Sequence, residues 1–117
     1  MDSIFFQKFS LITTITLFVM SFSFGQNIHI SDYQSGADLT AFVVDYESRA
    51  DLLVYRVEYE SQAGINDGNW YFVDYQSQSD KSIFFVEYES QADIKIYFVQ
   101  YESQAGWKTT TKKQFLE

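Results

Sequence analysis

Six copies of the tripeptide Tyr-(Glu/Gln)-Ser recur along the chain, and this repetition constrains the fold more than any other feature. The spacings between the successive tyrosines are 13, 13, 16, 13 and 13 residues. Repetition at a fixed period predicts a fold assembled from copies of one small unit. The longer gap contains the turn-rich stretch 64–70 and divides the six units into two groups of three. The six tyrosines are Tyr33, Tyr46, Tyr59, Tyr75, Tyr88 and Tyr101.

Each unit contains a short run of β-branched and aromatic residues, such as Leu52–Val57 or Ile94–Val99. These residue types favour strands, so the sequence predicts an all-β domain of six units of about 13 residues in two pseudo-symmetric halves. Alternate residues share one face of a strand. One face therefore carries an aromatic residue, then a valine, then the repeat tyrosine, and we expect this face inward with most tyrosine rings buried. Its aromatic and valine members are Phe42, Tyr55, Tyr71, Phe84, Tyr97, Val44, Val57, Val73, Val86 and Val99.

The opposite face of the predicted strands is also largely apolar, which indicates strands that are covered on both sides. Arg56 interrupts this face, and we expect its head group to reach water or a carboxylate. The members of this second face are Ala41, Val43, Val54, Arg56, Trp70, Phe72, Ile83, Phe85, Ile96 and Phe98.

The segment Glu-Ser-Gln-Ala-Asp joins one predicted strand to the next. Its Ser and Asp side chains are suited to bonding nearby backbone amides, which predicts a turn; a single helical turn is the less favoured alternative. Gly64 and Gly106 replace the Asp in two copies. They predict a positive φ or a close approach of the backbone at these positions.

The N-terminus has the pattern of a secretory signal peptide. An apolar stretch at 9–24 follows a short head, and Ser23 and Gly25 place small residues at the −3 and −1 positions, so cleavage is expected after Gly25. A transmembrane anchor is the alternative, but the apolar run is short and contains Thr and Ser, whereas a spanning helix needs about 20 apolar residues. The chain is therefore expected to be secreted or periplasmic, with no membrane span after cleavage.

The predicted boundaries are a signal peptide at 1–25, a linker at 26–31, a β-repeat domain at 32–107 and a loose polar tail at 108–117. Cleavage leaves 117 − 25 = 92 residues without cysteine, so disulfides cannot stabilise the domain. The net charge of −8 argues against nucleic acid as a partner, because phosphate neutralisation requires Lys and Arg.

The repeated Tyr-Glu-Ser-Gln-Ala-Asp, the strand Ile94–Val99 and the closing Gln104-Ala105-Gly106-Trp107 resemble the family of 7(1) septoil knot domain proteins. The resemblance covers roughly 32–107, most of the mature chain. It implies a small β domain whose backbone winds around itself as a seven-crossing torus knot, in a family without a known function. Composition and spacing alone predict a short-period β-solenoid or a small barrel.

Catalytic chemistry has little support in the sequence. The single histidine, His29, lies three residues after the expected cleavage site and is interpreted as a solvated side chain. Neither a zinc-type ligand set nor a phosphate-binding glycine loop is present. Acidic residues recur in phase and are interpreted mainly as turn caps and a solvated rim, with Ca²⁺ binding or a glycosidase pair as weaker alternatives. These residues are Asp38, Asp51, Asp80, Asp93, Glu47, Glu60, Glu89 and Glu102.

The sequence therefore predicts a non-enzymatic structural or interaction module, with no catalytic, cofactor-binding or metal-binding residue assigned. The alternative is a ligand-binding module for glycans or Ca²⁺. Trp70, Trp107 and the repeat tyrosines are the candidates for stacking on a sugar. The core also needs aromatic residues, so the two tryptophans are expected to plug the ends of the fold.

Overall fold

A computed structural model describes residues 26–117, and the predicted signal peptide lies outside these residues. Short strands alternate with short 3₁₀ helices, so the predicted all-β class is confirmed. The strands are β1 (Gln26–Ile30), β2 (Leu39–Val43), β3 (Leu52–Arg56), β4 (Asn69–Val73), β5 (Lys81–Phe85), β6 (Ile94–Phe98) and β7 (Gly106–Trp107). The 3₁₀ helices are η1 (Gln34–Gly36), η2 (Glu47–Arg49), η3 (Glu60–Gln62), η4 (Gln76–Gln78), η5 (Glu89–Gln91), η6 (Glu102–Gln104) and η7 (Lys113–Leu116).

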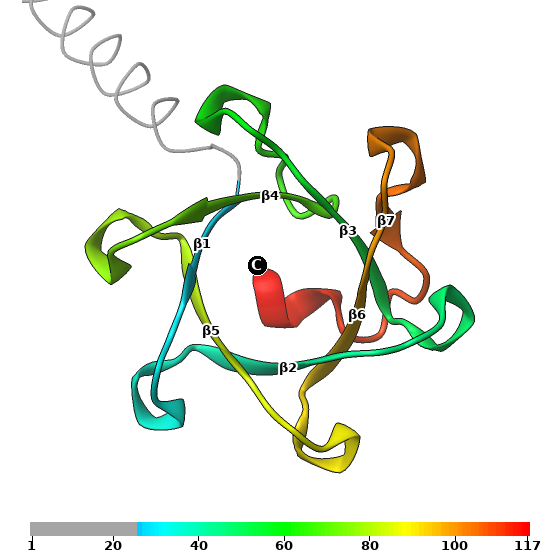
Figure 1. Ribbon diagram of the computed structural model, residues 1–117, viewed down its shortest axis with the longest axis horizontal. Coiled ribbons are helices and arrows are strands. Elements are labelled where there is room, and N and C mark those ends of the chain that lie inside the picture. Colours follow the sequence, from blue (N-terminus) through cyan, green and yellow to red (C-terminus); the bar gives the residue numbers. More distant parts are fainter. Residues whose placement is uncertain (1–25) are drawn as a thin grey trace, which may run out of the picture.

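Strands β1 to β6 form a closed barrel in which all paired neighbours are parallel (Figure 1). The order around the barrel is β4-β1-β5-β2-β6-β3, and the pairing of β3 with β4 closes the ring. Strand β7 adds to β3 in the antiparallel direction. The first three strands of the chain thus alternate around the ring with the next three, and the path from β1 to β6 passes around the barrel about one and a half times.

The connection between β3 and β4 differs from the others in length and in the step that it makes. Every other connection within the barrel skips one neighbouring strand, whereas β3 and β4 are adjacent. In a ring of six strands, a constant step of two positions would return to β1 after three connections. The longer segment supplies the change of step. It includes Gly68, whose φ of 90° favours glycine and where a Cβ would contact the Leu53 carbonyl oxygen and lie 2.9 Å from the Gly106 nitrogen.

Gly64 and Gly106, which replace the repeated Asp, are glycine for different structural reasons. Gly106 has a φ of 142°, a conformation that favours glycine. Gly64 has no positive φ, but a Cβ there would collide with the carboxylate of Asp67. The first case agrees with a positive φ, and the second is a close approach by a side chain rather than by the backbone.

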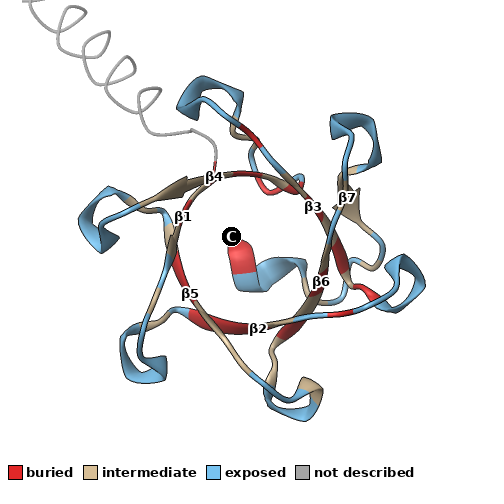
Figure 2. Ribbon diagram, in the orientation of Figure 1, coloured by how far each residue is buried: buried red, intermediate tan, exposed pale blue. Residues whose placement is uncertain are grey.

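Side chains of the second strand face form the core cluster, so the prediction that the aromatic–valine–tyrosine face points inward is wrong. Figure 2 shows that buried segments lie along the ring of strands and that the outward turns are exposed. A ring of six strands encloses a narrow space that is filled mostly by branched aliphatic side chains. Trp70 is the largest fully buried side chain of the core. The aromatic residues of the other face lie half-buried on the outside of the barrel. The core cluster is Ile28, Leu39, Ala41, Leu52, Val54, Trp70, Ile83, Ile94, Ile96 and Leu116.

The repeat tyrosines are exposed, contrary to the prediction that most of their rings are buried. Their exposed fractions run from 64% to 74%. Each tyrosine is the residue before a 3₁₀ helix, beyond the end of its strand, and the six turns project outward as lobes (Figure 1). The alternation of faces applies only within a strand, and the repeat tyrosines lie beyond the strand ends. The helical turn, the less favoured alternative, is the correct description of these connections.

The C-terminal segment turns into the ring, whereas the sequence predicts a loose polar tail (Figure 1). Leu116 in η7 is 3% exposed and belongs to the core cluster. The Lys112 Nζ lies 3.4 Å from the Asp51 carboxylate. The polar tail therefore ends in one apolar side chain, Leu116, that packs into the core of the barrel.

Candidate interaction surface

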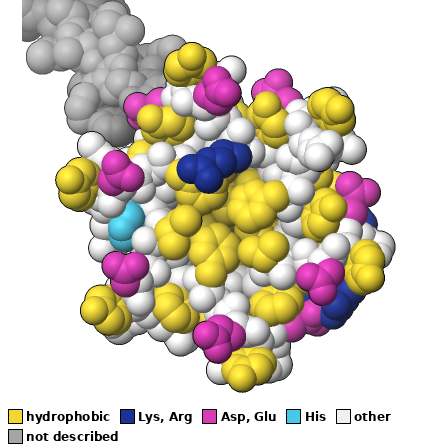
Figure 3. All heavy atoms as spheres, in the orientation of Figure 1, with side chains coloured by type: hydrophobic (Ala, Val, Ile, Leu, Met, Phe, Trp, Pro, Cys, Tyr) yellow, Lys and Arg dark blue, Asp and Glu magenta, His cyan; other side chains and the backbone are white. Residues whose placement is uncertain are grey.

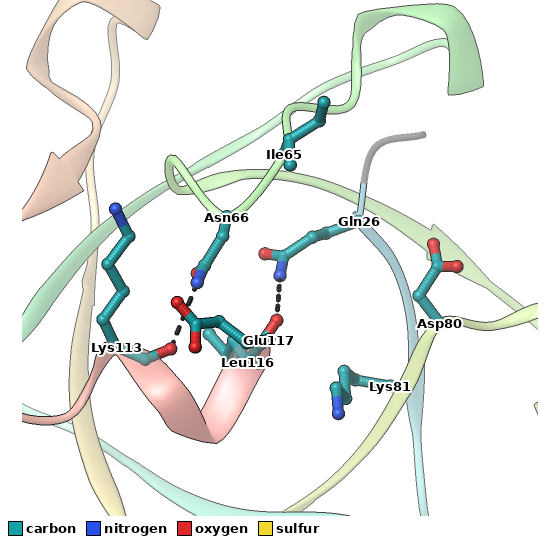
Figure 4. A pocket seen from close by; sticks show the side chains of 8 residues that line it. All are labelled: Gln26, Ile65, Asn66, Asp80, Lys81, Lys113, Leu116 and Glu117. Atoms are coloured by element: carbon teal, nitrogen blue, oxygen red, sulfur yellow. Dashed lines mark hydrogen bonds between the residues drawn. The ribbon is translucent and has the colours of Figure 1, made fainter. Parts of the chain in front are cut away.

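The two mouths of the barrel have different surroundings. All barrel strands are parallel, so their amino ends lie at one mouth and their carboxyl ends at the other. The amino mouth is occupied by η7, which two buried amide side chains hold in place (Figure 4). Gln26 Nε2 donates to the Leu116 carbonyl at 2.8 Å, and Asn66 Nδ2 donates to the Lys113 carbonyl at 3.1 Å.

The same two amides also bond the two tryptophans of the chain. Trp70 Nε1 donates to Gln26 Oε1 at 3.1 Å, and Trp107 Nε1 donates to Asn66 Oδ1 at 2.9 Å. Trp70 is 0% exposed, so its ring cannot stack on a sugar. Trp107 is half-buried and packs against the core. Both indoles therefore serve the closure of the amino mouth and the core beside it.

A hollow of about 550 Å³ remains beside η7, lined by Gln26, Ile65, Asn66, Asp80, Lys81, Lys113, Leu116 and Glu117. Gln26 and Asn66 are committed to the C-terminal turn, and the Asp80 carboxylate accepts the Asn27 backbone N–H at 2.8 Å. Several polar side chains at this mouth are thus engaged in hydrogen bonds that hold the two ends of the domain in place.

The carboxyl mouth carries a ring of six strand-end residues that continue the inward face to the surface. We call them the mouth ring. They are placed by the alternation within each strand, because each lies two residues after a core residue. Figure 3 shows one face of the molecule with hydrophobic side chains gathered at its centre and a Lys or Arg side chain lying against them. The mouth ring consists of Ile30, Val43, Arg56, Phe72, Phe85 and Phe98.

Apolar side chains of the mouth ring are open to solvent. The exposed fractions are 49% for Ile30, 43% for Val43 and 39% for Phe98. Phe72 and Phe85 are half-buried and pack against the core. A contiguous exposed apolar patch on a soluble domain commonly marks a binding surface.

Phe72 lies at the centre of the aromatic contacts in the mouth ring. Its ring meets Trp70 edge to face at 6.0 Å between centroids, and it meets Phe98 at 6.4 Å. The Arg56 guanidinium carbon lies 4.7 Å above the Phe72 centroid, a cation–π arrangement. Arg56 is exposed, which confirms that its head group reaches water. The mouth ring is thus supported from below by the buried indole.

Five exposed carboxylates follow the mouth ring, each two residues after one of its members. Figure 3 shows acidic side chains around the apolar centre. Glu58 lines a hollow with Arg56 and Phe72, and Asp74 lines a neighbouring hollow with Phe72. We call these carboxylates the acidic rim. Its members are Asp32, Asp45, Glu58, Asp74 and Glu87, and the sixth position is Gln100.

The in-phase aspartates bond backbone amides, as predicted, but they do so across strands rather than within their own turns. Each carboxylate accepts an N–H from a strand 44 or 53 residues away. In each pair the aspartate's own N–H donates to the partner's carbonyl at 2.7 to 3.1 Å. The pairs are Asp38 with Ser82, Asp51 with Lys95, Asp80 with Asn27 and Asp93 with Thr40, at N···O distances of 2.7, 2.9, 2.8 and 2.9 Å.

The other acidic repeat positions lie in the lobes, at the first residue of a 3₁₀ helix. Glu89 pairs with Arg49 of a neighbouring lobe, and Glu60 accepts from Asn27 Nδ2 at 2.8 Å. Glu47 and Glu102 are exposed. Within residues 26–117, no group of three or more His, Asp or Glu side chains is arranged to hold a metal ion.

His29 is half-buried and bonded, whereas the sequence predicts a solvated side chain. Its Nδ1 lies 2.8 Å from the hydroxyl of Ser82, which is 0% exposed. The nearby carboxylate of Asp38 bonds the Ser82 backbone N–H rather than the imidazole. Among residues 26–117, no carboxylate bonds this imidazole, so His29 and Ser82 lack the orienting partner of a Ser-His-Asp triad. The bond follows from the register of β1 with β5, which places His29 beside Ser82.

The mouth ring was not among the sequence-predicted candidates, because its members lie on the face that was not predicted to line the core. The signal was present in the repeat, since the same strand position is apolar in five of six copies. The exposed tyrosines remain available for stacking, whereas Trp70 does not.

Comparison with known proteins identifies one family model, the 7(1) septoil knot domain, which matches residues 25–108. No curated protein and no solved structure gives a significant match. Among residues 26–117, no helix has the length and apolar character needed to cross a membrane.

Proposed function

We propose that the chain, which belongs to the 7(1) septoil knot domain family, is a non-enzymatic interaction module that acts outside the cytoplasm. It binds a partner through the mouth ring. The observation that carries this proposal is the position of Ile30, Val43 and Phe98, whose apolar side chains are 39% to 49% exposed at the same end of the barrel. Burial of this surface against a partner removes apolar area from water, which favours association.

The N-terminal pattern supports an extracytoplasmic location. A leader with small residues at the −3 and −1 positions precedes Gln26. Gln26 is also the first residue of β1, so cleavage after Gly25 would leave every barrel strand intact. The mature protein is proposed to begin at the first residue of the barrel.

The proposal of a non-enzymatic role is supported by the uses of the reactive side chains. The four repeated aspartates bond backbone amides of neighbouring strands. The Ser82 hydroxyl is buried under its contact with His29. These groups contribute to the structure of the barrel and are not gathered in one reactive site.

The chain path is proposed to be the seven-crossing torus knot after which the family is named. Support comes from the strand order, in which β4, β5 and β6 fill the gaps left by β1, β2 and β3. A path that circles a ring more than once and interlaces its successive passes is compatible with such a knot. The knot would give the domain kinetic resistance to unfolding in place of disulfides.

A photo-crosslinking experiment tests the binding surface. Benzoylphenylalanine replaces Phe98 in one sample and Phe115, 37% exposed and located in η7, in the control sample. We expect the probe at position 98 to crosslink to components of the extracytoplasmic extract. Excess unlabelled wild-type protein should abolish these crosslinks, whereas excess Phe98→Lys protein should not. Equal products from both positions, or products indifferent to the competitor, would overturn the proposal.

A second candidate function is glycan binding through the tyrosine lobes. The six repeat tyrosines are 64% to 74% exposed, and each directly precedes one of the 3₁₀ helices in the exposed lobes around the ring (Figure 2). Aromatic faces of this kind can stack on sugars. A glycan array probed with the wild type, Tyr88→Ser and Phe98→Ser distinguishes the two surfaces, because only the tyrosine substitution would weaken binding at the lobes.

A further inference from the structure

We propose that the partner segment bound by the mouth ring is cationic and amphipathic, with apolar side chains flanked by Lys or Arg. This inference rests on the proposed function, since it names the chemistry of the partner at the same surface. It follows from two features that lie together at the carboxyl mouth: an apolar centre and the acidic rim.

The apolar centre selects the inner part of the partner segment. Phe72, Phe85 and Phe98 present aromatic rings, while Ile30 and Val43 present aliphatic side chains. Apolar burial contributes roughly 25 cal/mol per Å² removed from water. A polar segment would lose its hydration over these rings without gaining hydrogen bonds, which disfavours binding.

The acidic rim selects the flanks of the segment. Five of the six rim positions carry a carboxylate, against a single cation, Arg56, in the mouth ring. Opposite charges attract, and they do so more strongly near a protein surface than in bulk water. Lys or Arg side chains that leave the apolar centre therefore meet carboxylates, whereas Asp or Glu side chains would be repelled.

Arg56 is proposed to orient the bound segment by donating hydrogen bonds, rather than to repel its cationic side chains. Its guanidinium carbon lies over the Phe72 ring, 4.7 Å from the ring centroid. The N–H groups at the edge of the guanidinium remain suited to donate to carbonyl oxygens. A main-chain carbonyl of the bound segment is a matching acceptor.

The same charges argue against a second copy of this chain as the occupant. Two copies joined through their carboxyl mouths would bring two acidic rims together, and each chain has a net charge of −8. Like charges opposed across an interface cost free energy. Sedimentation equilibrium checks this point, and a dimer that Phe98→Ser dissociates would overturn the inference.

The test uses three fluorescein-labelled synthetic peptides and the mature chain. The first peptide is an amphipathic Leu/Lys helix, the second has every Lys replaced by Glu, and the third has every Leu replaced by Ser. Anisotropy titrations measure the Kd of each peptide. We expect the Leu/Lys peptide to bind at least about tenfold more tightly than either relative, a ratio that corresponds to about 1.4 kcal/mol.

Variants assign the binding to the proposed groups. Phe98→Ser and, separately, Ile30→Ser at a more exposed position should each raise the Kd of the Leu/Lys peptide about tenfold or more. The double variant Glu58→Gln, Asp74→Asn should raise this Kd several-fold and reduce the salt dependence of binding. Matched controls are Phe115→Ser in η7 and Glu102→Gln in a lobe, which should leave the Kd unchanged. Circular dichroism confirms that each variant is folded.

Three outcomes would overturn the inference: preferential binding of the Leu/Glu peptide, binding that the rim variant does not weaken, or no binding of any peptide. None of these affects the photo-crosslinking result at position 98, which tests the mouth ring without any assumption about charge. A face-specific crosslink together with preference for the acidic peptide would retain the proposed function and reject only the cationic partner.

Discussion

Gln26 and Leu116 lie 90 residues apart in the chain and are joined by a 2.8 Å hydrogen bond from the Gln26 side-chain amide to the Leu116 carbonyl. The same amide accepts the Trp70 indole N–H at 3.1 Å. The first residue of the barrel thus connects the last turn of the chain to the largest side chain of the core. Both bonds are buried, so their loss would leave polar groups without water.

Gln26→Ala is expected to destabilise the domain by about 1 to 3 kcal/mol, because it leaves the Trp70 N–H and the Leu116 carbonyl without partners. Guanidinium denaturation followed by far-UV circular dichroism measures the change in the free energy of unfolding. Gln34→Ala, in an exposed lobe, is the control and should change it by less than about 0.5 kcal/mol. Equal effects of both substitutions would contradict the role of Gln26.

Leu116→Ala tests whether the C-terminal turn belongs to the core. We expect a loss of about 2 to 5 kcal/mol, the range for deleting a buried leucine side chain. The neighbouring Phe115→Ala is the control, and it should cost much less because Phe115 is 37% exposed. Thermal melts of both variants report the difference. A chain whose last turn were a loose tail would show no loss with either substitution.

Asp93→Ala tests the bonds that tie strands β1 to β3 to strands β4 to β6. It removes the carboxylate that accepts the Thr40 N–H at 2.9 Å, and we expect a loss of about 1 to 3 kcal/mol. Asp93→Asn retains an acceptor oxygen and should lose less. The exposed Asp45→Ala is the control. If the aspartates instead bound Ca²⁺, the melting temperature of the wild type would rise with Ca²⁺ and fall with EGTA, and we expect neither change.

The positions of β2 to β6 and the all-β class could be predicted from the sequence, because β-branched and aromatic runs are local signals. The predicted linker at 26–31 is wrong, because Gln26–Ile30 forms β1, a strand of the barrel. The face that lines the core could not be predicted, since both faces of these strands are apolar. In β6, Ile96 points inward and Tyr97 outward. The choice depends on the narrow interior of a six-stranded ring, which excludes a full set of aromatic side chains.

The mouth ring and the cross-strand aspartate bonds escaped prediction for a related reason. Residues such as Arg56 and Phe72 come together only because β3 pairs with β4, and Asp93 meets Thr40 only through the interlaced strand order. The C-terminal turn gave only a short apolar signal, Phe115 and Leu116, at the end of a polar run, and only Leu116 is buried. Local sequence patterns do not encode which strand among β1 to β3 pairs with which strand among β4 to β6.

Tyr88→Ser is expected to change the free energy of unfolding by less than about 0.5 kcal/mol, because the ring is 64% exposed in a lobe. Tyr97→Ser, on the half-buried outer face of β6, is the comparison and should cost more. Chemical denaturation of the two variants ranks the positions. A larger loss at Tyr88 than at Tyr97 would restore the inward placement of the repeat tyrosine.

The proposed knot leads to a kinetic prediction, since a threaded backbone has to be withdrawn before the chain can unfold completely. After a jump into concentrated guanidinium, we expect unfolding with a half-life on the order of hours, at the slow end for small domains. Fluorescence of the buried Trp70 follows the reaction.

The matched control carries a protease site inserted into the exposed lobe of η3, between β3 and β4. Cleavage at this site retains every strand but divides the chain between β3 and β4, so the threading no longer holds the two parts together. The cleaved protein should unfold faster than the intact one by orders of magnitude. Equal rates before and after cleavage, or complete unfolding of the intact chain within milliseconds, would show that threading does not limit unfolding.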